Sequence, residues 1–259
     1  MNNGDMEVKK ILGPGTYQFS AIKMEKLGAT EYTLVTIVLD VTGSVRPFAD
    51  SLLDLVKTVI SACKDNPRSE NLLVRFTTFD DNVTEVHGFK PIADIDENDY
   101  EKLNPYGRTA LFEATSESIR ATLTQGEDMT KEGNDYDVNA AIYIITDGMD
   151  NASNPMITPA SINGDINGAL RQEDNVESLT TILIGLKDAT IDGDAYAKNV
   201  ATALTTFKDE AGLTDFINFG EVTDSKLAKL GNLISESISS VSQGLANPGS
   251  QPVSQQLVF

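Results

Sequence analysis

The sequence has little of the chemistry on which most metal and redox sites depend. It contains one cysteine, Cys63, and one histidine, His87. A single cysteine excludes a disulfide within the chain and a multi-cysteine zinc site, and a single histidine excludes a site built on a histidine pair. Any metal site must then use oxygen ligands. We expect Cys63 to fill the core from the apolar face of a helix and His87 to be a surface residue of a strand or turn.

Basic residues are also scarce. The chain has 20 Lys and Arg against 39 Asp and Glu, which gives a formal net charge of −19. Nucleic-acid binding requires a basic face that neutralises phosphates, and the largest basic cluster here is the pair Lys9-Lys10. We therefore predict no nucleic-acid partner. A field of this sign attracts cations.

Long apolar runs are missing as well. No stretch approaches the ~20 apolar residues that span a bilayer, and the first ten residues, MNNGDMEVKK, lack the apolar region of a secretion signal. Hydrophobic residues nevertheless make up 40% of the chain, which is ordinary for a globular protein. We therefore expect a folded, cytoplasmic protein that does not associate with membranes.

Alternating apolar strands and amphipathic helices predict an α/β fold. The run YTLVTIVL at 32–39 is almost continuously apolar and β-branched, as expected of a central strand buried on both faces of a parallel sheet. Strands in this order imply right-handed crossovers, helices on both faces and a Rossmann-like, mostly parallel sheet with one antiparallel edge strand. The other predicted strands are 71–79, 83–89, 140–146, 179–186 and 215–220, and the predicted helices are 47–63, 110–123, 161–174, 194–209 and 224–242.

The pattern divides the chain into one domain with two appendages. Residues 1–31 form an N-terminal extension, in which 15–24 alternate as in a strand or hairpin. The domain proper covers 32–243. The tail, 244–259, is rich in Gly, Pro, Ser and Gln without helical period, and we expect it to be flexible.

Oxygen-bearing side chains recur where predicted strands end. Asp40, Thr42 and Ser44 alternate after the first core strand, Thr109 precedes a helix, and Asp147 follows the strand AIYIIT. Each element alone is also what helix capping or a tight turn produces. Together they fall where ligands bind in such sheets, beyond the carboxyl ends of the strands. Carboxylate and hydroxyl oxygens are suited to a hard cation such as Mg²⁺.

These segments resemble a known metal site. DVTGS at 40–44, GRTAL at 107–111 and TDGMDN at 146–151 are similar to the metal-ion-dependent adhesion site (MIDAS) of von Willebrand factor A domains, with coverage from 32 to 243. Arg108 departs from the double glycine of the family, and its side chain could cap an acidic partner or point to solvent. The intracellular bacterial and phage type associated with tellurite resistance looks most similar.

The resemblance implies a protein-interaction module rather than an enzyme. Asp40, Thr42, Ser44, Thr109 and Asp147 would hold Mg²⁺, or Mn²⁺ or Ca²⁺, and an Asp or Glu carboxylate of a protein partner would complete the coordination. The family's intracellular members suggest a role in stress response or defence.

Two alternatives of other classes stay open. A Mg²⁺-dependent, phosphatase-like hydrolase would use Asp40 as a nucleophile, although Thr42 stands where its general acid would be. An assembly subunit with a vestigial site would dock through the tail residues 253–259, added as a strand to a partner sheet. A weaker metal-site candidate, Asp94-x-Asp96-x-Asn98, resembles the start of an EF-hand loop but lacks the glycine at the sixth position.

Overall fold

A six-stranded sheet forms the centre of the protein. The computed structural model describes residues 6–11, 17–131, 134, 136–171, 176–187 and 194–243. The strand order is β5-β4-β3-β6-β7-β8, and all neighbours are parallel except β4 and β5, which form an antiparallel edge. The strands are β3 (Glu31–Asp40), β4 (Leu72–Phe79), β5 (Val83–Pro91), β6 (Asp137–Thr146), β7 (Ser178–Lys187) and β8 (Asp215–Glu221).

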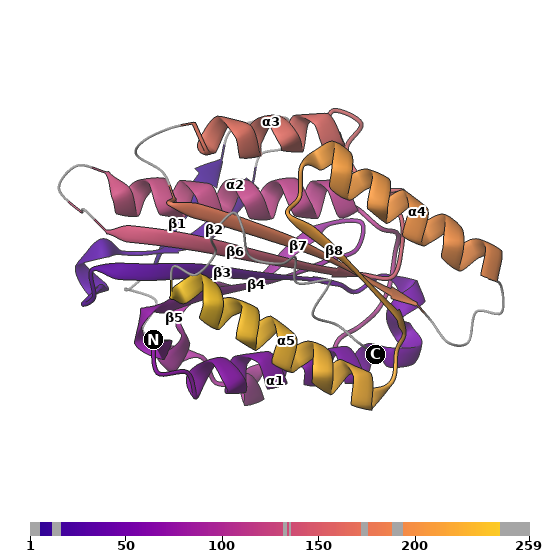
Figure 1. The fold of residues 1–259 in the computed structure, drawn as a ribbon, viewed down its shortest axis with the longest axis horizontal. Coiled ribbons are helices and arrows are strands. Elements are labelled where there is room, and N and C mark those ends of the chain that lie inside the picture. Colours follow the sequence, from indigo (N-terminus) through magenta and orange to yellow (C-terminus); the bar gives the residue numbers. More distant parts are fainter. Residues whose placement is uncertain are drawn as a thin grey trace.

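Helices cover both faces of this sheet (Figure 1). On one face lie α1 (Ala49–Lys64) and α5 (Asp224–Ser242), and on the other lie α2 (Leu111–Thr130), α3 (Pro159–Ala169) and α4 (Asp194–Ala211). Each face buries its own hydrophobic cluster. The predicted fold class, a mostly parallel sheet with one antiparallel edge strand and helices on both faces, is confirmed.

The central strand β3 explains the apolar run that predicted it. It pairs with β4 on one side and β6 on the other, so its backbone hydrogen bonds are satisfied within the sheet. Val35, Ile37 and Leu39 face the cluster beneath α1 and α5, while Leu34 and Val38 face the cluster beneath α2. Because successive side chains point to opposite faces, a strand covered on both sides must be apolar throughout.

The N-terminal residues form a hairpin that belongs to the core. Strands β1 (Met6–Ile11) and β2 (Tyr17–Ile22) pair antiparallel as a separate two-stranded sheet. Phe19 is buried in the cluster on the α2 face. The backbone of β2 approaches β5 so closely that a Cβ atom at Gly88 would lie 2.0 Å from the carbonyl oxygen of Ser20. The extension predicted at 1–31 therefore packs on the domain through β1 and β2.

A buried ion-pair network ties the hairpin to the sheet and to α2. Arg75 on β4 is fully buried and donates to both carboxylate oxygens of Glu117 on α2, at 2.6 and 3.1 Å. Its Nε donates to Glu85 on β5 at 2.9 Å. The backbone N–H of Ser20 on β2 donates to the same Glu85 carboxylate at 3.0 Å. The Arg75 guanidinium thus links β4 directly to α2 and β5, and Glu85 extends this link to β2.

Two helix ends differ from the sequence prediction by more than two residues. Helix α2 continues to Thr130, so the loop expected after residue 123 begins seven residues later. The extension is stabilised by burial of Met129 in the cluster on the α2 face, a tertiary contact that the spacing along the chain did not indicate. Helix α3 ends at Ala169 rather than 174, and 172–175 lie outside the described residues.

The EF-hand-like segment folds as a short capped turn. The carboxylate of Asp96 accepts from the backbone N–H and the side-chain amide of Asn98, each at 2.9 Å. The alternating acids are thus explained by local hydrogen bonds that stabilise the 3-10 turn Glu97–Asp99.

The expected core position of Cys63 is confirmed, but the surface position predicted for His87 is wrong. Cys63 lies buried on α1. His87 is also buried, because the segment after β5 folds back over it and places Tyr100 against its ring. Its Nδ1 lies 2.9 Å from the carbonyl oxygen of Gly88, which only accepts, so Nδ1 carries the proton and Nε2 accepts from the Tyr100 hydroxyl. Burial lowers the pKa of His87 to about 4.

This histidine should make stability fall in mild acid. The unfolded chain takes up the proton near the ordinary pKa of 6.5, whereas the folded protein resists it down to a pKa of about 4, so its contribution is complete above 6.5 and decreases as pH falls toward 4. Between about pH 7 and pH 5 we expect the free energy of unfolding to fall by roughly 1–2 kcal/mol more in the wild type than in His87→Gln. Urea unfolding across this range measures the difference, and parallel curves for the two proteins would contradict it.

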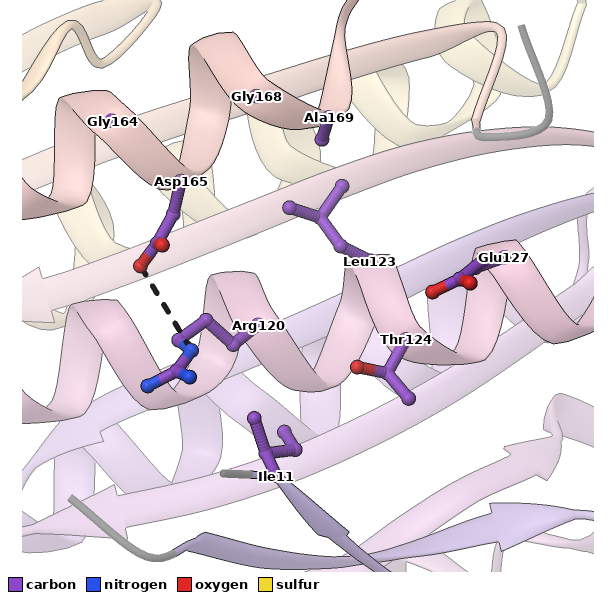
Figure 2. A pocket seen from close by; sticks show the side chains of 9 residues that line it. All are labelled: Ile11, Arg120, Leu123, Thr124, Glu127, Gly164, Asp165, Gly168 and Ala169. Carbon is purple, nitrogen blue, oxygen red and sulfur yellow. Dashed lines mark ion pairs between the residues drawn. The ribbon is translucent and has the colours of Figure 1, made fainter. Parts of the chain in front are cut away.

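A pocket of about 330 Å³ lies between α2 and α3, beside the end of β1. Figure 2 shows Arg120 of α2 and Asp165 of α3 meeting across it as an ion pair, with an N–O distance of 3.9 Å. Leu123 and Ile11 supply apolar walls. The α2 residues that line this pocket run from the middle of the helix toward its C-terminal end, whereas the carboxyl edge of the sheet lies at the start of α2. Among the described residues, no helix is long and apolar enough to cross a membrane.

Candidate metal centre

The first and third predicted site segments meet at one edge of the sheet. Strands β3 and β6 are parallel neighbours, and Leu39 pairs with Ile145 near their carboxyl ends. Asp40, the next residue of β3, and Asp147, two residues after Ile145, therefore reach the same edge. Here the chain leaves the sheet, so side chains can gather without breaking backbone pairing.

Four of the five predicted ligand residues form one hydrogen-bonded cluster. The Oδ1 atom of Asp40 accepts from the backbone N–H of Thr42 at 2.8 Å. The hydroxyl oxygens of Thr42 and Ser44 lie 3.0 Å apart, and the Ser44 hydroxyl donates to Oδ1 of Asp147 at 2.8 Å. Two carboxylates and two hydroxyls from loops about a hundred residues apart in the chain are thus brought together.

The two carboxylates of the cluster, Asp40 and Asp147, differ in how deeply they are buried. Asp40 is completely buried, and Asp147 is 8% exposed. Burial raises the pKa of Asp40, because its charged form is removed from water, and this is opposed by hydrogen bonds from Thr146 and Thr42. Ser44, by contrast, is exposed. The cluster runs from a buried carboxylate at its base to a hydroxyl at the surface.

Thr109 reaches the same edge from the start of α2. A methyl group built on Gly148 would lie 3.4 Å from the hydroxyl oxygen of Thr109, which places this hydroxyl beside the segment that carries Asp147. The backbone N–H of Thr109 donates to Oδ1 of Asn151 at 2.8 Å, and its carbonyl accepts from the N–H groups of Asn151 and Ala152. The loop after β6 therefore fixes the position of Thr109.

The same loop caps α2, a role that the sequence did not indicate. Asp150 accepts from the backbone N–H of Phe112 at 3.1 Å, and the hydroxyl of Ser153 accepts from the N–H of Glu113 at 2.9 Å. The Glu113 carboxylate in turn accepts from the N–H of Asn154. These bonds satisfy free N–H groups of the first turn of α2 and lock the two segments together.

Thr146 is a second positioning residue that sequence reasoning missed. Its hydroxyl donates to Oδ2 of Asp40 at 2.6 Å, so both oxygens of that carboxylate are held. The segment TDGMDN was identified, but only its Asp147 was assigned a role. The signal available in the sequence was a threonine directly before Asp147, because a side chain at the end of one strand can reach the end of the adjacent strand.

The departure at Gly107-Arg108 has a structural explanation. Gly107 has a φ of 78°, in the left-handed region, and a Cβ atom there would lie 2.3 Å from Oδ2 of Asp81. Asp81, in the β4–β5 turn, accepts from both the backbone N–H and the Nε of Arg108, at 3.0 and 2.9 Å. Arg108 thus anchors its loop to a neighbouring turn while its side chain stays 69% exposed.

The residues present fit a hard divalent cation. Such ions take oxygen ligands and, in the case of Mg²⁺, usually keep several waters, so two carboxylates and two or three hydroxyls suffice. Within the described ranges no group of three or more His, Cys, Asp or Glu side chains gathers around a point, so no all-carboxylate or nitrogen-sulfur cage competes with this one. That Asp40, Thr42, Ser44, Thr109 and Asp147 are the metal ligands stays a prediction.

The chain is similar to several solved structures at low sequence identity. No protein-family model matches it, and no curated protein matches its sequence. The PilB minor pilin from Streptococcus sanguinis superposes with a TM-score of 0.55 at 14% identity, over 88% of this chain and 66% of that one. The pilus adhesin SpaC from Lactobacillus rhamnosus GG, in an open conformation, gives a TM-score of 0.53 at 11% identity, over 93% and 35%.

Another similar structure is proximal thread matrix protein 1 from the mussel byssus, described with a zinc-occupied MIDAS motif. It has 14% identity, a TM-score of 0.49 and coverage of 81% of this chain and 46% of that one. This chain therefore spans only part of each of these proteins. The similarities to the pilin and the adhesin show the fold alone, an α/β fold with a mostly parallel central sheet, as predicted from the sequence. The resemblance of the site to that of von Willebrand factor A domains stays a prediction.

Proposed function

We propose that the chain is a protein-interaction module whose binding of a partner depends on a divalent cation. The observation that supports this most directly is the cluster of Asp40, Thr42, Ser44 and Asp147, in which carboxylates and hydroxyls converge at the carboxyl edge of the sheet. A bound divalent cation would supply the positive charge that an incoming carboxylate neutralises.

The side chains of the cluster suit reversible capture. Hydroxyl ligands are neutral, so Thr42 and Ser44 would leave the site with more positive charge than a cage of carboxylates would. Asp40 is held at the base by Thr146 and by the backbone of Thr42, and cannot swing out to compete with a partner. Ser44 lies at the exposed rim, which is where a partner carboxylate would enter.

The same geometry argues against the hydrolase alternative. A nucleophilic aspartate must be reached by its substrate, but Asp40 is completely buried at the base of the cluster, where a small cation could use its remaining lone pairs and a larger substrate could not. We therefore propose binding without catalysis. The assembly alternative depends on the tail 253–259, which lies outside the described residues.

The cellular setting stays a prediction. We propose a cytoplasmic protein with a role in bacterial or phage stress response or defence, and Mg²⁺ as the cation, with Mn²⁺ or Ca²⁺ as substitutes. The low-identity matches include a minor pilin and a pilus adhesin, so a comparison of cell fractions is the direct check of location.

Selection from a random short-peptide library tests the proposed function without a known partner. The purified chain would be loaded with Mg²⁺, and bound clones would be released with a chelator. We expect released clones to be enriched in Asp or Glu at one position, because a partner carboxylate completes the site. Two results would contradict the proposal. One is recovery of the same clones with and without the chelator, and the other is a set of chelator-released clones that lack an acidic residue. The same selection with the Asp40→Asn variant should yield no acidic clones that the chelator releases.

A further inference from the structure

We propose that Tyr106 is the specificity residue of this site, and that the preferred partner is an acidic segment carrying an apolar side chain near the carboxylate that enters the metal centre. This inference rests on the proposed function and adds the chemical character of the partner. It is carried by the placement of Tyr106, its exposure, and the charges around it.

The backbone of Tyr106 is fixed directly against the metal-site loop. Its N–H donates at 2.9 Å to the carbonyl of Val41, the residue between the predicted ligands Asp40 and Thr42. On its other side, the carbonyl of Gly107 accepts from the N–H of Gly43 at 3.4 Å. The position of Tyr106 is therefore set by the same loop that carries the ligands.

Neighbouring side chains add to this rigidity. The guanidinium of Arg46 donates to the carbonyl of Pro105 at 3.0 Å, and Arg108 is held by Asp81. Pro105 has a restricted backbone, and Gly107 has a left-handed conformation that other residues rarely adopt. A tyrosine on a rigid backbone loses little conformational entropy when a partner covers its ring, which is why tyrosine is common at the centre of interfaces.

The side chain of Tyr106 is largely exposed to solvent beside the metal-site loop. Its side chain is 71% exposed, and it is the only aromatic among the large hydrophobic residues that the described part leaves on the surface. Single exposed apolar residues are common and need no explanation by themselves. This one lies beside a metal-site loop, and Met156, which is 69% exposed, belongs to the loop after β6 that carries Asp147. Two exposed apolar side chains thus come from segments that build the site.

Charge favours an acidic partner at this edge in spite of the overall charge of −19. Arg46 and Arg108, two of the few arginines, lie on the two loops next to Tyr106, and both are exposed. Arg46 donates to a carbonyl, and no ion pair within the described ranges involves it. Arg108 is paired with Asp81, so Arg46 supplies the positive charge beside Tyr106 that would attract an acidic segment, in contrast to the repulsion expected over much of the remaining surface.

The test uses the peptides released by chelator in the selection described above. We expect these peptides to share an apolar residue at a constant offset from the acidic one. Their affinity for the Mg²⁺-loaded chain should fall about tenfold in Tyr106→Ser, as on loss of a hot-spot side chain, with Mg²⁺ affinity unchanged. Leu170→Ser is the matched control, because it removes an apolar side chain that is 53% exposed at the end of α3, remote from the site. That variant should bind like the wild type.

Two results would overturn the inference while leaving the proposed function intact. One is a set of acidic, chelator-released peptides without a shared apolar residue. The other is equal affinity of such peptides for Tyr106→Ser and the wild type. Failure of the proposed function looks different, since the wild type itself would then show no metal-dependent recovery of acidic peptides.

Discussion

Replacing Asp40 by asparagine should lower the affinity for Mg²⁺ by about a hundredfold or more, because the variant loses the buried anionic ligand of the proposed centre. Asparagine has nearly the same shape, and its amide oxygen can still accept from the backbone N–H of Thr42. The side-chain amide would then face the hydroxyl of Thr146, which can accept as well as donate. The loss of binding should therefore occur in a folded protein.

The metal-free variant should be at least as stable as the wild type. Burial raises the pKa of Asp40, which means that its charged form carries a desolvation cost that the hydrogen bonds from Thr146 and Thr42 offset only in part. The Asp40→Asn variant does not carry this cost. Sites of this kind are often kept at the expense of stability. Addition of Mg²⁺ should then raise the melting temperature of the wild type and leave that of Asp40→Asn unchanged.

Isothermal titration calorimetry with chelator-stripped protein measures this effect. Asp54→Asn is the matched control, since Asp54 is an exposed carboxylate on α1 and its substitution removes the same charge from the chain. We expect one-to-one binding in the wild type and in Asp54→Asn. Binding of Mg²⁺ to Asp40→Asn with wild-type affinity would show that the cluster is not the metal centre. The same titration with Mn²⁺ and Ca²⁺ would establish which cation the site prefers.

Replacing Arg75 by methionine should destabilise the protein by about 3–5 kcal/mol, because it leaves the Glu117 carboxylate buried without its partner. Arg75 and Glu117 are both almost inaccessible, with side-chain exposures of 1% and 4%. Burial raises the pKa of Glu117, and Arg75 opposes this shift by stabilising the charged form. Without the guanidinium, Glu117 must take up a proton or draw water into the core. Chemical unfolding with urea measures the change.

Two further variants separate the cost of an orphaned charge from the value of the pair. Arg75→Met combined with Glu117→Leu should recover most of the lost stability, since neither charge then remains buried. Lys102→Met breaks an ion pair with Asp50 whose side chains are 76% and 74% exposed, and it should change stability by no more than about 1 kcal/mol. A loss in Arg75→Met as small as that in Lys102→Met would mean that the network does not join the hairpin, β5 and α2 as the structure indicates.

The elements of the fold with the clearest apolar patterns were predictable. Strand β3 was recognisable because burial on both faces requires an unbroken apolar run, and α5 because its leucines and isoleucines recur on one face. The last seven residues of α2 were not, since Gln125 and Gly126 are buried by contacts that no local pattern reveals. His87 was misplaced for the same reason, because the residue that covers it, Tyr100, lies thirteen positions away.

The sequence by itself determined the type of sheet and the chemical kind of site. Periodicity decides which face of an element is apolar, and Asp40, Thr42, Ser44 and Asp147 follow strands whose carboxyl ends must share an edge. Only the tertiary structure decided what holds these groups. Thr146, Asn151 and the loop after β6 act through hydrogen bonds that join distant segments. The hairpin, the Arg75 network and the exposed position of Tyr106 were decided in the same way, because each depends on which segments meet in space and not on the order of residues along the chain.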